Sequence, residues 1–208
     1  MPRFQLLTGI GNKLQRASFE RQVEAQLPSL VRVARGLISQ PTDAEDLVHD
    51  TCVKALTSFD SAKFTSDSKF QAWLKRILIN TYRDQYRHAQ RSPVRSIDYH
   101  ATSDEHLNVI ELVASTELSP SENMEHRKSS SAIQNAFATL PPEVRVVSVL
   151  FLVNELSYKE IAYITESPIG TVMSRLSRGR KLLRDQLSDY APQDNKTLVD
   201  AIDRSNEA

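Results

Sequence analysis

Two helix start signals lie only ten residues apart in the last third of the chain, at Ser157 and Ser167. The segment from Ser157 onward can therefore form only a short helix followed by a longer one. Ser157 with Glu160 three residues later has the pattern of a capping box, and Ser167 followed by Pro168 is typical of a second helix start. Apolar residues at helical spacing follow each start. Gly179 lies among the apolar positions of the longer helix, which predicts close packing against a neighbouring helix. A short helix, a tight connection and a longer basic helix form a helix-turn-helix.

The longer helix is expected to have one apolar and one polar face. The predicted inward residues are Ile169, Val172, Leu176, Gly179 and Leu183. The predicted outward residues are Thr171, Ser174, Ser177, Arg178 and Lys181, with Arg175 and Arg180 at the flanks and Met173 at an edge. Small hydroxyl groups permit close approach to a major groove, and Arg178 could read a guanine edge or a phosphate. A helical hairpin with a basic exterior is the alternative interpretation.

A second helical region occupies the first hundred residues. Apolar residues recur at helical spacing from Phe19 to Ser39, where Pro28 predicts a kink or two shorter helices. Thr42 with Glu45 predicts a capping box for the next helix. One face of that helix holds Leu47, Val48, Thr51, Cys52, Ala55, Leu56 and Phe59, and the other holds Asp46, His49, Asp50 and Val53. On periodicity alone, a solvated acidic face is the simpler interpretation and a partner site is the alternative.

Segment 69–91 is a basic helix interleaved with aromatic residues, in which Asp84 is the only acid. Its expected inward stripe is Phe70, Trp73, Leu74, Ile77, Leu78 and Thr81. The rest of its surface is expected to hold Lys75, Arg76, Ile79, Asn80, Arg83, Tyr86 and Arg87, with Tyr82 at the boundary. Cations that follow a phosphate backbone and rings that stack on unpaired bases suit single-stranded nucleic acid. A basic solvated helix is the alternative.

The formal net charge of zero results from cancellation between segments. The chain holds 26 Lys and Arg against 26 Asp and Glu, but residues 1–92 carry 14 basic and nine acidic side chains while residues 93–128 carry three and seven. Segment 93–128 mixes Ser, Thr, Pro and acids without periodicity, as flexible or extended linkers do. We therefore predict an all-α fold of two small helical domains joined by a flexible acidic linker, the second ending in the helix-turn-helix. The predicted parts are an N-terminal extension (1–18), domains at 19–92 and 129–190, the linker (93–128) and a tail (191–208).

Cysteine usage and hydropathy limit the class of protein. The single cysteine, Cys52, excludes an intramolecular disulfide, and its apolar spacing predicts packing. The N-terminal residues lack the apolar core of a signal peptide, and the most apolar run, Val144 to Val153, falls short of the ~20 residues that span a bilayer. We expect a cytoplasmic protein without membrane insertion, catalytic residues, metal or cofactor.

Four motifs in order resemble a bacterial alternative sigma factor of the extracytoplasmic-function group. They are TDAEDLVHDTCVKAL, FQAWLKRILINTYRDQYR, LPPEVRVV and LSYKEIAYITESPIGTVMSRLSRGRKLL. The resemblance implies that the protein binds core RNA polymerase, recognises the minus-35 and minus-10 promoter elements and promotes DNA melting for a stress regulon. Many relatives place arginine where this chain has Met173, so an apolar contact could replace a polar one there.

The resemblance also implies roles for individual residues. The acidic helix would dock on the clamp helices of the largest polymerase subunit through Asp46, His49, Asp50 and Val53. The minus-10 element would be read by Lys63, Phe64, Trp73, Asn80, Arg83 and Arg87. The minus-35 element would be contacted by Thr171, Ser174, Arg175, Ser177, Arg178 and Lys181.

Further partners follow from the same resemblance. The second domain would also meet the polymerase flap, and the linker could cross the channel that nascent RNA later uses. The GTVMSRL run and the layout are similar to the subgroup paired with zinc-containing, thiol-based anti-sigma factors. With Cys52 as the only cysteine, any redox sensing would then reside in the partner. The expected location is the cytoplasm, on the nucleoid through polymerase or held by an anti-sigma factor.

Two other functions are compatible with parts of the sequence. A stand-alone helix-turn-helix regulator would leave the acidic and the basic-aromatic helices unexplained. A metal-dependent hydrolase would have to use linker residues at unsuitable spacings, namely Asp98, His100, Asp104, Glu105 and His106.

Overall fold

A computed structural model describes residues 16–58, 66–91 and 132–187, and every regular element in these ranges is a helix. The N-terminal unit comprises a helix at 16–25, α2 (Leu27–Leu37), α3 (Pro41–Thr57) and α4 (Asp67–Arg91). The C-terminal unit comprises a helix at 132–139, α6 (Pro142–Leu152), α7 (Tyr158–Thr165) and α8 (Ile169–Leu187). The all-α prediction is confirmed for these residues. The predicted linker 93–128, with the five candidate hydrolase ligands, and the tail 191–208 lie outside the described ranges.

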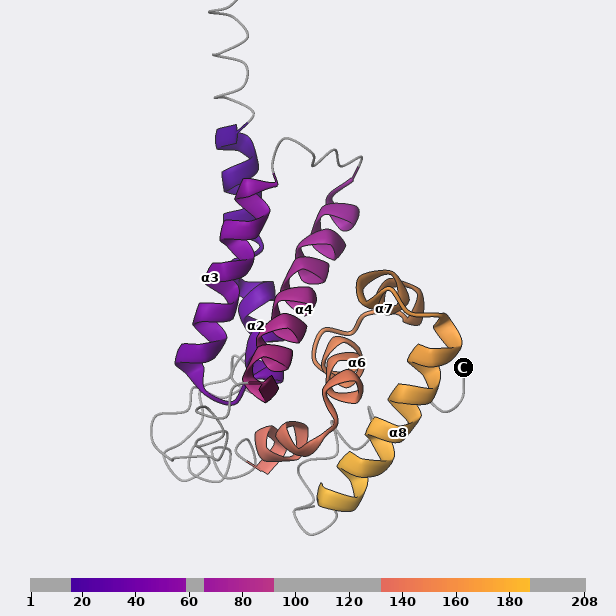
Figure 1. Ribbon diagram of the computed structural model, residues 1–208. Helices are drawn as coiled ribbons and strands as arrows, with labels where there is room; N and C mark the ends of the chain where they lie inside the picture. Colours follow the sequence, from indigo (N-terminus) through magenta and orange to yellow (C-terminus); the bar gives the residue numbers. More distant parts are fainter. Residues whose placement is uncertain (1–15, 59–65, 92–131, 188–208) are drawn as a thin grey trace, which may run out of the picture.

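The N-terminal unit is a bundle in which α2, α3 and α4 pack side by side (Figure 1). The helix at 16–25 stops at Gln26, and α2 begins with Pro28 in its first turn, so the alternative of two shorter helices is confirmed. The predicted Thr42 capping box is wrong. Because Pro41 starts α3 and Gln40 caps it without a side-chain hydrogen bond, Thr42 already lies inside the first turn.

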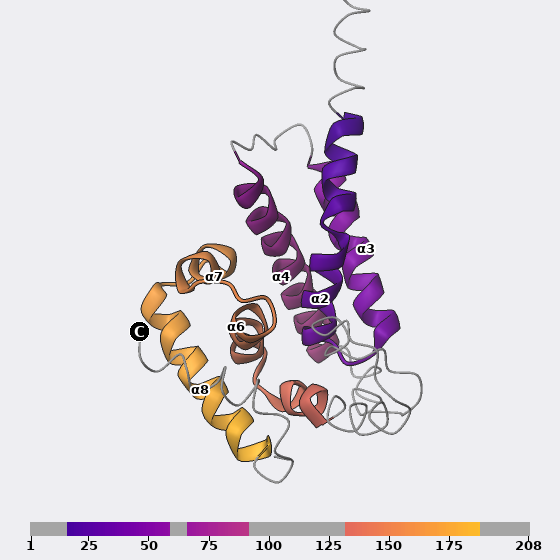
Figure 2. The same cartoon turned by 180° about the vertical axis from the view of Figure 1, so that it is seen from behind.

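The C-terminal unit places α6 between α4 and α8, as both ribbon views show (Figures 1 and 2). The predicted capping box at α7 is confirmed, because the Ser157 hydroxyl accepts from the Glu160 backbone N–H and the Glu160 carboxylate accepts from the Ser157 backbone N–H at 2.9 Å. Ser167 does not cap α8 in the expected way, since its hydroxyl donates to the Thr165 carbonyl and accepts from Arg175.

Helix α8 packs tightly on α6 at a glycine. A side chain added at Gly179 would overlap the Ser148 hydroxyl and lie 3.1 Å from a Val144 methyl carbon. The predicted close approach at Gly179 is therefore confirmed. The Ser148 hydroxyl is buried without a hydrogen-bond partner at this contact.

The two units pack against each other, and one tight contact between them is again at a glycine. A Cβ atom at Gly36 of α2 would lie 2.7 Å from a methyl carbon of Val149 in α6. Nearby, Arg145 of α6 donates to the Leu37 carbonyl at 3.0 Å, and also to the carbonyls of Ala138 and Leu140 in its own unit. Because the guanidinium satisfies carbonyls that helix ends leave free, it joins the end of α2 to the C-terminal unit.

Two helices differ from their predicted faces. Lys75 and Ile79 were expected on the surface of α4, yet Lys75 is only 7% exposed and Ile79 is fully buried. Helix α7 covers this side of α4, which helical periodicity within α4 could not reveal. Ile169 was expected to face inward on α8 and is instead exposed at the start of the helix.

Candidate nucleic-acid and protein interfaces

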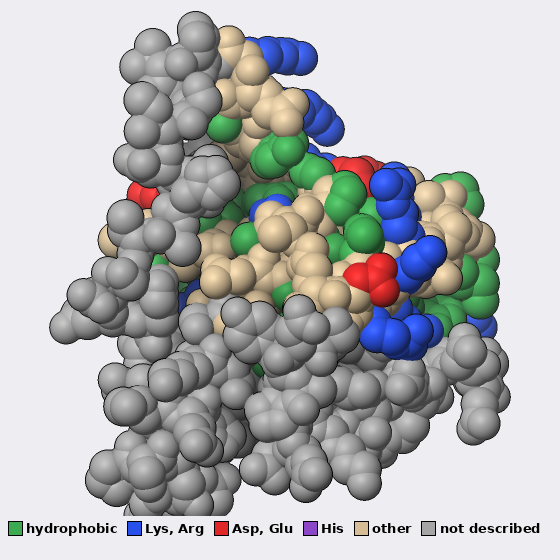
Figure 3. Space-filling view, turned by 90° about the horizontal axis from the view of Figure 1, so that it is seen from below, with side chains coloured by type: hydrophobic (Ala, Val, Ile, Leu, Met, Phe, Trp, Pro, Cys, Tyr) green, Lys and Arg blue, Asp and Glu red, His purple; other side chains and the backbone are tan. Residues whose placement is uncertain are grey.

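Helix α8 presents a polar and basic surface. Ser174, Ser177, Arg178 and Lys181 are exposed, as the helical pattern predicts, and Thr171 is half-buried. Lys and Arg side chains gather on the side of the molecule where α7 and α8 lie, with acidic and hydrophobic side chains beside them (Figure 3). Small hydroxyls next to long cations can approach a groove edge while neutralising phosphates.

Arg175 differs from its exposed neighbours on α8. Its guanidinium lies 3.2 Å from the Glu143 carboxylate and donates to the Ser167 hydroxyl, also at 3.2 Å. It is therefore engaged within the protein rather than presented to the solvent face. The sequence predicted it at the flank of the polar surface, and the ion pair explains why it turns inward.

Arg83 of α4 is held by the same acid. Two of its nitrogens donate to the two oxygens of Glu143 at 2.9 and 2.7 Å, and a third contact of 3.3 Å reaches the Thr165 carbonyl. The Arg83 side chain is only 15% exposed. A predicted minus-10 contact thus lies in the interface between the two units.

Glu143 is the centre of this ion-pair cluster, which we define as Arg83, Glu143 and Arg175. Burial by itself would raise the pKa of Glu143, but the hydrogen bond and charge of Arg83, with the charges of Arg175 and Arg87, more than offset it. The pKa therefore lies below its ordinary value. Glu143 is ionised at neutral pH, and its single negative charge is shared between one arginine from each unit.

A second polar contact joins α4 to the end of α7. The Arg76 guanidinium pairs with the Glu166 carboxylate and stacks 5.8 Å from the centre of the Tyr163 ring. Beside them, burial lowers the pKa of Lys75, an effect that the charge of Glu160 partly reverses and Arg32 reinforces. The acids on α6 and α7 thus face the basic side of α4.

The remaining predicted minus-10 residues have diverse environments. Asn80 and Arg87 are exposed, and Arg87 lies 3.2 Å from Asp84 on the same helix. Trp73 is half-buried, with its ring stacked 6.0 Å from Phe70 and edge-on 6.2 Å from Phe19. This aromatic cluster gives Trp73 a packing role. Lys63 and Phe64 lie outside the described residues.

The acidic face of α3 is exposed as predicted. All four residues predicted on this face are exposed, namely Asp46, His49, Asp50 and Val53. The Gln85 amide of α4 donates a hydrogen bond to the Asp50 carboxylate at 3.1 Å. Val53 is among the large apolar side chains that remain exposed in the described ranges. A surface that combines carboxylates with an exposed apolar residue suits a basic protein partner better than a nucleic acid.

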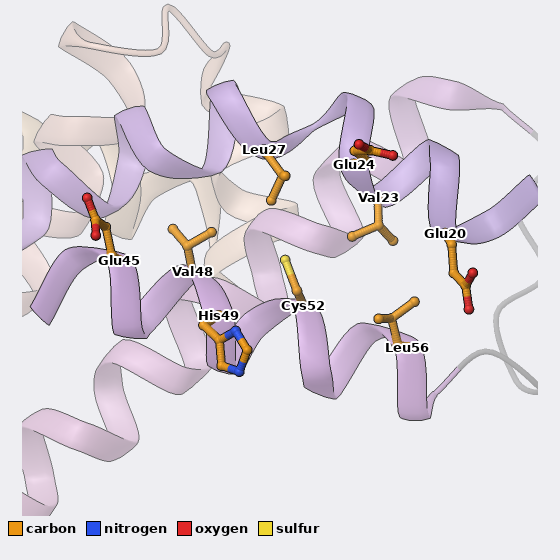
Figure 4. A pocket seen from close by; sticks show the side chains of 9 residues that line it. All are labelled: Glu20, Val23, Glu24, Leu27, Glu45, Val48, His49, Cys52 and Leu56. Atoms are coloured by element: carbon orange, nitrogen blue, oxygen red, sulfur yellow. The ribbon is translucent and has the colours of Figure 1, made fainter. Parts of the chain in front are cut away.

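A groove of about 400 Å³ borders this face, between α3 and the helix that precedes α2 (Figure 4). Its floor is apolar and its rim is acidic. The lining residues are Glu20, Val23, Glu24, Leu27, Glu45, Val48, His49, Cys52 and Leu56. Cys52 points into the groove, and burial raises the pKa of its thiol, so it stays protonated at neutral pH.

Helical periodicity gave no sign of the roles of Glu143 and Glu166. Each is an isolated acid at a helix end, and its partner on α4 lies 60 residues (Arg83 for Glu143) or 90 residues (Arg76 for Glu166) earlier in the chain. The one sequence signal for such pairing is segment 143–166, which holds four acids against two basic residues, whereas α4 is strongly basic.

The helical bundle and the unit that ends in a helix-turn-helix each match a known protein family. The chain matches the Sigma-70 region 2 family over residues 22–92 and the Sigma-70 region 4 family over residues 130–183. It is 30% identical over 172 residues to the ECF RNA polymerase sigma factor SigW of Bacillus subtilis, covering 83% of this chain and 90% of the relative. It is 34% identical over 146 residues to the ECF RNA polymerase sigma-E factor of Salmonella typhimurium, covering 70% and 74%.

Solved structures give the same result. The sigma factor RpoE of Bartonella quintana, in complex with the anti-sigma factor NepR, has a TM-score of 0.61 at 29% identity, covering 82% of this chain and 97% of that chain. CnrH, solved with the cytosolic domain of CnrY, shares the fold at a TM-score of 0.56 and 24% identity. The chain belongs to the ECF family of RNA polymerase sigma factors, and it is an alternative sigma factor for promoter-directed transcription. This family consists of transcription initiation factors rather than enzymes.

Proposed function

We propose that α8 reads the minus-35 element through Ser174, Ser177 and Arg178, with Thr171 and Lys181 beside them and Arg175 positioning the helix. The observation that supports this most directly is the exposed polar and basic surface on the second helix of the helix-turn-helix. The N-terminal part of such a helix contacts base edges, and its cations contact phosphates.

The test of this role is run-off transcription with bacterial core polymerase over a promoter library. The chain should redirect initiation to promoters that share a minus-35 sequence. Arg178→Ala should weaken binding by about 1–3 kcal/mol and relax the preference at one position if the residue reads a base. Specific binding of the isolated chain to duplex DNA, with no effect on polymerase, would instead favour a stand-alone regulator.

In the proposed minus-10 role, Asn80, Arg83 and Arg87 of α4 bind the DNA, together with Lys63 and Phe64. Trp73 contributes by holding α4 in place through its aromatic cluster. Because Glu143 and Thr165 occupy Arg83, the C-terminal unit must move away from α4 before Arg83 can reach a phosphate or a base. Binding of the two units to separate sites on polymerase would supply the free energy for this separation.

The proposed polymerase-binding surface is the exposed face of α3, through Asp46, His49, Asp50 and Val53. Asp50→Arg reverses one charge at an exposed position and should abolish association with core polymerase while the thermal unfolding midpoint changes little. The matched control is Glu155→Arg, the same charge change at an exposed position between α6 and α7. Equal association of both variants with core polymerase would contradict the docking face.

We also propose that an anti-sigma factor holds this chain in the cytoplasm until a stress signal releases it to polymerase on the nucleoid. The solved relative RpoE is bound to such a factor. A zinc-containing, thiol-based factor is the proposed type. Cys52 is half-buried with a raised pKa, so a redox signal would act on the partner. Co-purification of the tagged chain from its own bacterium tests this, with zinc analysis of any protein captured.

Within the described ranges, no helix is long and apolar enough to cross a membrane.

A further inference from the structure

Two large apolar side chains are exposed on the first two turns of α8. Met173 is 48% exposed and Ile169 is 43% exposed. The other large apolar residues that are exposed in the described ranges have different settings, since Val53 belongs to the α3 face and Tyr163 lies under the Arg76 guanidinium. Met173 and Ile169 face away from the α6 contact of their helix, and together they form one exposed apolar patch rather than two scattered residues.

The two side chains belong to one row along the helix. Residues four apart are neighbours on a helix surface, which places Ile169, Met173, Ser177 and Lys181 in line. The adjacent row contains Gly170, Ser174 and Arg178. The exposed surface of α8 therefore has an apolar edge at its N-terminal end that runs into the hydroxyls and cations of the proposed reading surface.

Gly170 opens a space beside this edge. A Cβ atom built there would have no other atom within 4 Å, and no glycine in the described ranges has a positive φ. The backbone therefore does not need glycine at this position. Its missing side chain instead lets a ligand come close to the helix backbone at the start of the Ser174 row, next to the Met173 row.

We infer that Met173, supported by Ile169, reads the C5-methyl group of a thymine in the minus-35 element, with the space at Gly170 admitting the methyl group. The inference rests on the proposed minus-35 role of α8. The thymine methyl is the apolar group that the major groove displays, and apolar side chains contact it. The cations at positions 178 and 181 lie on the same side of the helix and favour DNA over an apolar protein surface here.

The test uses holoenzyme assembled from core polymerase and the full chain, on the promoter that library selection has identified. Each thymine of its minus-35 element is replaced in turn by deoxyuridine, which removes only the methyl group. At one position the affinity should fall about fourfold, the effect of one buried methyl-sized group. With Met173→Ala the same replacement should have no effect, whereas Arg178→Ala should retain the full methyl sensitivity.

Substituting arginine for Met173 allows a second test of the same contact. Repeating the library selection with Met173→Arg should shift the preference at the same position from thymine to guanine, because arginine pairs with the guanine edge. Met173 is exposed, so both variants should melt at the temperature of the unchanged protein.

The outcomes separate this inference from the proposed function. Two results would exclude contact of Met173 with a thymine methyl group while leaving minus-35 recognition by α8 intact. In the first, Arg178→Ala lowers promoter binding but no deoxyuridine replacement does. In the second, Met173→Ala loses as much affinity on deoxyuridine replacement as the unchanged protein does. If neither Arg178→Ala nor any minus-35 change affects binding, the proposed function of α8 fails. A loss of core or anti-sigma binding in Met173→Ala, without a change in methyl sensitivity, would assign the apolar edge to a protein partner and overturn the inference.

Discussion

Helices α4 and α8 have similar sequences in one respect, since both are long, basic and amphipathic, but their cations have different environments. On α4, Arg76 and Arg83 are paired with acids from the other unit and Lys75 is buried. On α8, Arg178 and Lys181 remain exposed. The difference arises because Glu143, Glu160 and Glu166 of the C-terminal unit all face α4, whereas on α8 Glu143 pairs with Arg175 and leaves Arg178 and Lys181 exposed. Whether a basic helix is available to DNA therefore depends on where the acids of the other unit lie.

The largest expected effect comes from disturbing the contact of α8 with α6. Gly179→Ala should destabilise the protein by about 2 kcal/mol, since the new methyl overlaps Ser148 and this cost exceeds the ~1 kcal/mol that alanine gains in a helix. Chemical denaturation measures the change. The matched control, Gly170→Ala on the same helix, meets nothing within 4 Å and should stabilise. Adding Ser148→Ala should restore part of the loss, and a lack of rescue would contradict the assigned clash.

A smaller effect should follow from removing the shared acid. Glu143→Gln keeps the shape but leaves Arg83 and Arg175 without a countercharge, which should weaken the contact between the units by about 1 kcal/mol. The freed arginines should raise the affinity of the isolated chain for single-stranded DNA several-fold at low salt. Fluorescence anisotropy measures this affinity, with Glu155→Gln as the control of equal charge change. Equal affinities for the two variants would show that the cluster does not limit access to α4.

The smallest expected effect is a pH dependence of the contact between the units. The pKa of Glu143 lies below its ordinary value, so its contribution is complete at neutral pH and is lost as the pH falls through the folded-state pKa. Energy transfer between labels on the two units should therefore decrease in acid below the ordinary pKa of a glutamate. The difference between the unchanged protein and Glu143→Gln isolates this residue from other acids such as Glu160. An identical pH profile in both would exclude Glu143 as the group that titrates.

Local signals predicted most of the elements and few of the contacts between the units. The Ser157 capping box, the break near Pro28 and the close approach at Gly179 were predicted correctly, because each depends on neighbouring residues or on one helix face. Thr42 was misassigned because Pro41 already starts the helix. Lys75 and Ile79 were misassigned because α4 packs against other helices, including α7, which is distant from it in the sequence.

The same limit applies to the candidate surfaces. The exposed face of α3 was predicted from periodicity, since nothing from the C-terminal unit covers the four residues involved. The environment of Arg83 was not predicted, since it depends on an acid from another unit. A sequence can thus indicate which residues are chemically suited to DNA without indicating which of them are already occupied.

The position of Arg145 bears on how the two units can come apart. Two of the carbonyls that its guanidinium contacts, those of Ala138 and Leu140, belong to its own unit, and only the Leu37 carbonyl and the weaker Tyr82 contact belong to the other. When the units separate, Arg145 keeps its anchor in the C-terminal unit, and water can replace it at Leu37. The separation that the proposed minus-10 role requires would therefore remove the contacts of Arg145 with Leu37 and Tyr82 and leave its contacts with Ala138 and Leu140 in place.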